Sequence, residues 1–120
     1  MFNIKKFQYG WMPPHPTFFI RKTVYDKYGI YNQNYRLAAD FELILRFLYK
    51  FKVSHVHVPK IFVKMRMGGA STKSFKNIFM LNKEMIQGCR DNCINTGWLK
   101  FSSKIYSKGL QFIFKRNYLA

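Results

Sequence analysis

The chain has 120 residues, of which 48% are apolar, and its 21 Lys and Arg face only five Asp and Glu, for a formal net charge of +16. This length allows one small domain, and the apolar content excludes a chain that is disordered by composition. So large a positive charge attracts phosphate in nucleic acid, in anionic lipid headgroups or in a nucleotide or lipid pyrophosphate, and charge alone does not choose among them.

Three features of the first third of the chain predict its local structure. Pro13, Pro14 and Pro16 bias residues 12–16 toward an extended backbone, and the apolar run at 17–20 predicts a short buried strand. Residues 21–28 have helical spacing, and Gly29 stands where a helix should stop.

The strongest predicted helix covers residues 37–51. Its apolar positions form one continuous stripe at helical spacing: Leu37, Phe41, Ile44, Leu45 and Leu48. Asp40 belongs to the first turn of this helix, at the edge of the stripe.

Alternation of side chains predicts two strands after this helix, at residues 53–58 and 61–67, interrupted by Pro59. A loop at residues 68–71 follows. His55 and His57 share one face of the first strand, where they form a candidate metal pair without an obvious third ligand, or simply a polar face.

A second amphipathic helix is predicted from Ser74 to Cys93. Its expected inner face comprises Phe75, Ile78, Phe79, Asn82, Met85, Ile86, Cys89 and Cys93. Two cysteines make neither a disulfide framework nor a zinc site, so we expect small buried side chains in a reducing compartment. The tail at residues 98–120 has five basic residues and no acid, which predicts a basic amphipathic helix.

No stretch approaches the roughly 20 apolar residues of a membrane span, and no long apolar run follows Lys5 and Lys6. We therefore expect a cytoplasmic protein that its charge can hold at a membrane surface.

Asp40 is the most informative candidate residue. A carboxylate in the first turn of a helix is favoured by the partial positive charge there, so Asp40 is either a capping acid or a positioned general base. Glu42 points to another face and is expected to be solvated or ion-paired. His15 lies on a rigid proline segment, where it binds a phosphate or hydroxyl group or simply the nearby backbone. The backbone of Gly68, Gly69 and Ser71 forms either a phosphate cradle or a plain loop.

These segments together resemble a known family. Trp-Met-Pro-Pro-His-Pro at 11–16, Tyr-Arg-Leu-Ala-Ala-Asp at 35–40 and Met-Gly-Gly-Ala-Ser at 67–71 occur in an order and spacing similar to the acceptor-side half of family 2 glycosyltransferases of bacterial surface-polysaccharide assembly. The resemblance covers about the first two-thirds of the chain.

The resemblance implies an α/β fold: part of a GT-A (nucleotide-diphospho-sugar transferase) domain at residues 1–97, with a small mixed sheet flanked by helices, followed by the basic amphipathic helix at 98–120. It implies inverting transfer of a sugar from a nucleotide sugar to a saccharide or lipid-linked acceptor at the inner membrane face. Asp40 takes the position of the family's general base. His15, Arg36, Gly68, Gly69 and Ser71 would bind the acceptor or phosphate.

The sequence also departs from the family. No Asp-x-Asp motif is present to hold the Mg²⁺ or Mn²⁺ ion that the complete enzyme uses, and Met67 stands where many relatives have a histidine. We therefore expect the chain to need association with a donor-binding half for activity. The alternative function is a non-catalytic basic module that binds an anionic membrane or nucleic acid, although no motif for specific nucleic-acid recognition is present.

Overall fold

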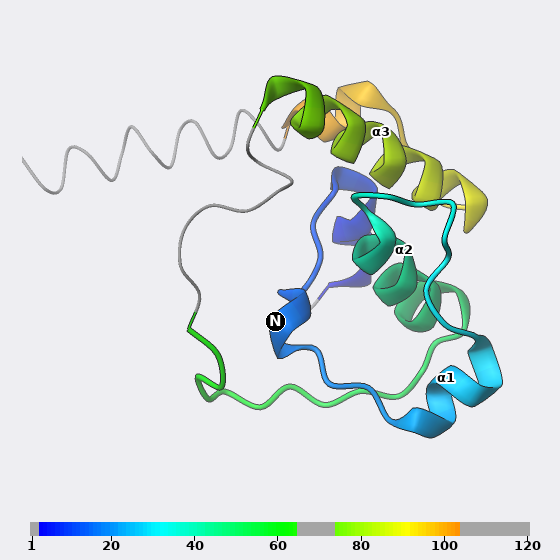
Figure 1. Ribbon diagram of the computed structural model, residues 1–120, viewed down its shortest axis with the longest axis vertical. Coiled ribbons are helices and arrows are strands. Elements are labelled where there is room, and N and C mark those ends of the chain that lie inside the picture. The colour runs from blue at the N-terminus through cyan, green and yellow to red at the C-terminus, as the bar shows by residue number, and fades with distance from the viewer. Residues whose placement is uncertain (1–2, 65–73, 104–120) are drawn as a thin grey trace, which may run out of the picture.

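The computed structural model describes residues 3–64 and 74–103, and all regular secondary structure in these ranges is helical (Figure 1). The 3-10 helices η1 (Ile4–Tyr9) and η2 (His15–Thr17) precede α1 (Lys22–Tyr28). Helix α2 (Ala39–Leu45) continues into the π-helical turn η3 (Arg46–Lys50). Helix α3 (Phe75–Asp91) comes next, and residues 98–103 form a further helical turn.

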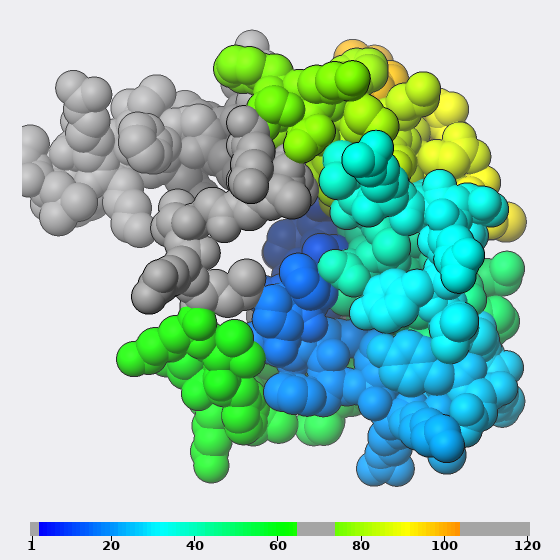
Figure 2. Space-filling model, in the orientation of Figure 1, coloured from blue at the N-terminus to red at the C-terminus, as the bar shows by residue number. Residues whose placement is uncertain are grey.

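The prediction of an α/β domain with a small mixed sheet is wrong for the part of the chain described. Residues 18–20 and 53–64 form no strand, and most side chains from 54 to 64 are exposed. Residues 58–64, in green, lie at the edge of the molecule in Figure 2. A strand needs a neighbour to pair its backbone groups, and alternation in sequence provides none. The part of the second predicted strand at 65–67 and the loop at 68–71 lie outside the described residues.

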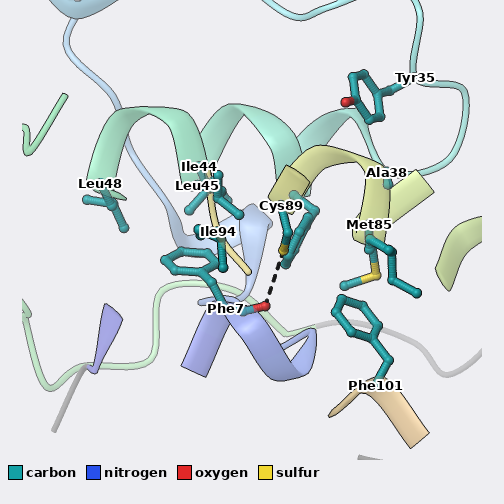
Figure 3. Close-up of a cluster of buried hydrophobic side chains, with 12 residues drawn as sticks. Phe7, Tyr35, Ala38, Ile44, Leu45, Leu48, Met85, Cys89, Ile94 and Phe101 are labelled. Atoms are coloured by element: carbon teal, nitrogen blue, oxygen red, sulfur yellow. Dashed lines mark hydrogen bonds between the residues drawn. The ribbon is translucent and has the colours of Figure 1, made fainter. Parts of the chain in front are cut away.

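Helix α2 and the turn η3 lie at the centre of the fold, between α1 and α3 (Figure 1). They confirm the helix predicted at 37–51, with slightly closer bounds. The helix is buried on nearly every side, because Leu43 and Phe47 are buried as completely as four of the five stripe residues, all except Leu37. Those four pack into the main core with side chains from η1, α3 and the 98–103 turn, as Figure 3 shows. That core comprises Phe7, Tyr35, Ala38, Phe41, Ile44, Leu45, Leu48, Met85, Ile86, Cys89, Ile94 and Phe101.

The other side of the central helix is covered by α1, which confirms the helix predicted at 21–28. The rings of Tyr25 and Tyr28 lie 5.7 and 6.4 Å from that of Phe47. Gly29 ends the helix with a positive φ of 90°. The guanidinium of Arg46 donates hydrogen bonds to the carbonyls of Tyr28 at 3.0 Å and Ile30 at 2.6 Å, so η3 holds the end of α1 in place.

The first segment of the chain packs beneath α2 and α3. Gly10 has a φ of 76°, and a Cβ atom there would lie 2.8 Å from the ring of Phe101. A residue other than glycine would therefore be strained and would also push the 98–103 turn away. Of the predicted amphipathic tail, residues 98–103 are helical and anchored by buried Phe101, and residues 104–120 lie outside the described residues.

Helix α3 confirms the helix predicted at 74–93, but only three of the eight residues of its predicted inner face are buried. Met85, Ile86 and Cys89 are buried, whereas Phe75, Ile78 and Phe79 are exposed. Burial raises the pKa of the Cys89 thiol to about 12, so this cysteine is an inert core residue, as expected. The same expectation is wrong for Cys93, which is exposed just beyond the end of α3. Periodicity identified the helix correctly, but it does not say how far along the helix its neighbours reach.

Glu84 joins α3 to the beginning of α2. Its carboxylate accepts hydrogen bonds from the backbone N–H groups of Arg36 at 3.1 Å, Leu37 at 2.7 Å and Ala38 at 2.8 Å. Ala38, the residue that caps α2, has no side chain able to do this. A carboxylate from another helix therefore satisfies the donors that lead into α2.

Replacing Glu84 by Ala should lower the free energy of unfolding by about 1–3 kcal/mol, because it leaves partly buried N–H groups without an acceptor. Urea unfolding followed by circular dichroism measures the change. Lys83→Ala, on the adjacent exposed position, is the control and should change stability by less than about 0.5 kcal/mol. Equal effects of the two substitutions would contradict the role assigned to Glu84.

Candidate functional site

Asp40 lies in the first turn of α2, and its carboxylate is partly exposed. The capping alternative is weakened, because the carboxylate of Glu84, not that of Asp40, accepts the hydrogen bonds leading into this helix. The core contacts of the next residue, Phe41, fix the helix that carries Asp40.

His15 lies opposite Asp40. Its Nε2 atom is 3.5 Å from Oδ2 of Asp40, and both side chains remain partly exposed. The turn η2 that carries His15 is held by Thr17, whose backbone N–H and hydroxyl both donate to the carbonyl of Pro14, at 3.0 and 2.8 Å. The structure thus brings together two residues that the sequence had indicated separately.

Tyr31 is a third member of the site that sequence reasoning missed. Its side chain lies close to Asp40 and Tyr25, and its pKa is raised above 10.0 by partial burial, by the charge of Asp40 and by Tyr25. Although 47% of Tyr31 is exposed, the Asp40 contact gives the raised pKa a specific cause. Tyr31 belongs to a loop without periodicity, which turns where Asn32 accepts from the backbone of Asn34 and Tyr35. No sequence pattern indicates that Tyr31 approaches Asp40.

The other predicted site residues do not join this group. Arg36 contributes a backbone N–H to Glu84 and has an exposed side chain. Gly68, Gly69 and Ser71 lie outside the described residues. Glu42 is buried, not solvated: its Oε1 lies 3.3 Å from Nε of Arg46, in an ion pair without hydrogen-bond alignment, and 3.4 Å from the amide of Asn92.

The sequence offered His55 and His57 as a candidate pair of metal ligands. In the described ranges no three His, Cys, Asp or Glu side chains lie close enough together to hold a metal ion. The Nδ1 atom of His55 lies 3.3 Å from the carbonyl of Val53. The residues at hand therefore do not fit the divalent cation that the resemblance implies.

Asp40 and His15 are both partly exposed to solvent. Neither residue lines the two hollows near Ile4 and Tyr49 on the described surface.

Searches against protein-family models, curated proteins and solved structures found no match for this chain. Among the described residues, no helix has the length and apolarity needed to cross a membrane.

The contact between Tyr31 and Asp40 predicts a coupled titration. We expect a pKa of Tyr31 above 10.0, and we expect it to fall toward that value in Asp40→Asn, because the negative charge that opposes the phenolate is lost. Some elevation should remain from burial, which is its largest cause. The measurement is an NMR titration of ¹³Cζ-labelled tyrosine, with Tyr31→Phe to assign the signal. An unchanged pKa in Asp40→Asn would contradict the contact.

Since this pKa is raised on folding, its contribution to stability is present below pH 10 and is lost as the pH rises through the folded-state value. Stability near neutral pH should therefore be insensitive to Tyr31 titration.

Proposed function

We propose that this chain supplies the acceptor side of a glycosyltransferase, with Asp40 as the general base. The observation that carries the proposal is the approach of His15 to within 3.5 Å of Asp40. Both residues belong to the motifs that resemble family 2 glycosyltransferases, and they lie far apart in sequence. Their proximity on a solvent-accessible surface is what a site for an incoming hydroxyl needs.

The chemistry is a direct displacement. The Asp40 carboxylate takes the proton from the acceptor hydroxyl as its oxygen attacks the anomeric carbon of the donor sugar. The bond from that carbon to the diphosphate breaks, and the nucleoside diphosphate leaves with its electron pair. His15 lies 3.5 Å from the carboxylate and Tyr31 lies near enough to be influenced by its charge, so both are placed to orient Asp40 toward the acceptor hydroxyl.

Donor binding is assigned to a separate half. The sequence has no Asp-x-Asp motif, and the described residues gather no ligand set for Mg²⁺ or Mn²⁺. The excess of Lys and Arg is suited to a pyrophosphate donor and to a lipid-linked acceptor at the inner membrane face.

Asp40→Asn should lower transfer by about 10²–10⁴-fold in an enzyme made complete with a donor-binding half, because it removes the proton acceptor. The complete enzyme would be made by co-expressing this chain with a donor-binding half. Release of nucleoside diphosphate from a panel of nucleotide sugars, with membranes as the acceptor, measures the rate.

Asp26→Asn is the matched control, since it removes the same charge from an exposed position on α1 and should leave the rate unchanged. Circular dichroism and unfolding would verify that both variants fold. Full activity of Asp40→Asn would overturn the assignment, and so would an equal loss in Asp26→Asn.

A further inference from the structure

An exposed apolar surface covers the first two turns of α3 and the start of the 98–103 turn. Phe75 and Leu99 are 93% and 91% exposed, and Phe79 and Trp98 are 57% and 47% exposed. We call these four residues the α3 aromatic patch. Figure 2 shows the beginning of α3, in light green, on the outside at one end of the molecule. Contiguous exposed apolar groups of this size mark a surface that meets a partner.

Contacts within the fold fix the positions of the patch residues. The rings of Phe79 and Trp98 stack at 5.1 Å with an angle of 14°, which joins α3 to the 98–103 turn. Phe75 lies one helical turn before Phe79, and Leu99 follows Trp98. Phe101, two residues beyond Leu99, is buried against Gly10 and fixes the turn from below.

The charge beside the patch is positive. Lys76 and Lys83 lie three residues before and four residues after Phe79, so they flank it on the helix surface, and both are exposed. The acids of α3 point elsewhere: Glu84 binds the backbone leading into α2, and Asp91 binds Tyr35 and Gln87. Aromatic and aliphatic side chains flanked by lysines fit the boundary between lipid tails and anionic headgroups.

Nucleic acid fits this surface less well. Bases bind by stacking on the open faces of aromatic rings. The facing surfaces of Phe79 and Trp98 are already covered by one another. Leu99, one of the two most exposed members, offers no ring at all.

We propose that the α3 aromatic patch inserts into the headgroup region of an anionic membrane, with Lys76 and Lys83 binding its phosphates. This docking does not depend on catalysis by Asp40. Lipid is the proposed ligand of this surface, and the experiment below distinguishes it from nucleic acid and from a second copy of the chain.

Trp98 provides a direct reporter. The chain has two tryptophans, so Trp11→Phe leaves Trp98 as the sole indole. With vesicles of phosphatidylglycerol and phosphatidylcholine, its emission should shift to the blue and be quenched by brominated lipid tails. Vesicles of phosphatidylcholine alone should bind much more weakly, and Lys76→Gln and Lys83→Gln should each weaken binding to the anionic vesicles about fivefold.

The decisive variant is Phe75→Ser with Leu99→Ser, which should reduce partitioning to anionic vesicles by at least about tenfold. Its matched control is Val56→Ser with Ile61→Ser, which removes two residues of similar exposure, 84% and 83%, from another part of the surface. The control should bind as the parent does. Because all four positions are highly exposed, neither variant should unfold, and circular dichroism verifies this.

Four results would overturn the proposal. Equal binding by the patch variant and its control, or binding without a shift in Trp98 emission, would mean attraction by charge alone. A Trp98 response to duplex or single-stranded oligonucleotides and none to vesicles would identify a nucleic-acid surface. A dimer in light scattering that the patch variant dissociates, with no vesicle binding, would identify an interface between two copies of the chain.

Discussion

The carboxylate of Glu84 holds the three backbone N–H groups of residues 36–38, and the placement of α2 depends on that contact. Helix α2 is the centre of the fold, with the main core on one side and α1 on the other. Its first turn carries Asp40, so Glu84 also determines where that carboxylate lies relative to His15 and Tyr31. One hydrogen-bonding group on α3 thus connects packing to the candidate site.

The small number of acids gives this arrangement a further consequence. Glu42 and Asp91 have partners within the fold, as Glu84 does, and Asp40 lies beside His15. The fifth acid, Asp26, is exposed on α1. Most of the Lys and Arg in the described part of the chain therefore have no acid beside them, and the net charge of +16 is available to attract anionic partners.

What the sequence predicted correctly was local. The helices at 22–28, 39–50 and 75–91 follow from apolar spacing and stop signals that a few neighbouring residues contain. The sheet was wrong, because a strand is defined by a distant partner, and residues 53–64 find none among the described residues. The exposure of Phe75 and the contact of Tyr31 with Asp40 likewise depend on neighbours from elsewhere in the chain, which periodicity does not identify. His15 and Asp40 were selected by motif, and only the fold brings them together.

Helix α3 relates the two proposed surfaces. Phe79 in the α3 aromatic patch and Glu84 are five residues apart, which is about 8 Å along a helix axis. A bilayer that accepted the patch would therefore lie close to the helix whose Glu84 fixes the beginning of α2. An acceptor anchored in that bilayer would have a short path to Asp40, and its effective concentration there would rise because it diffuses on a surface and not through solution. The two proposals involve different residues, but both depend on α3, which carries Phe79 of the α3 aromatic patch and Glu84, the residue that positions α2.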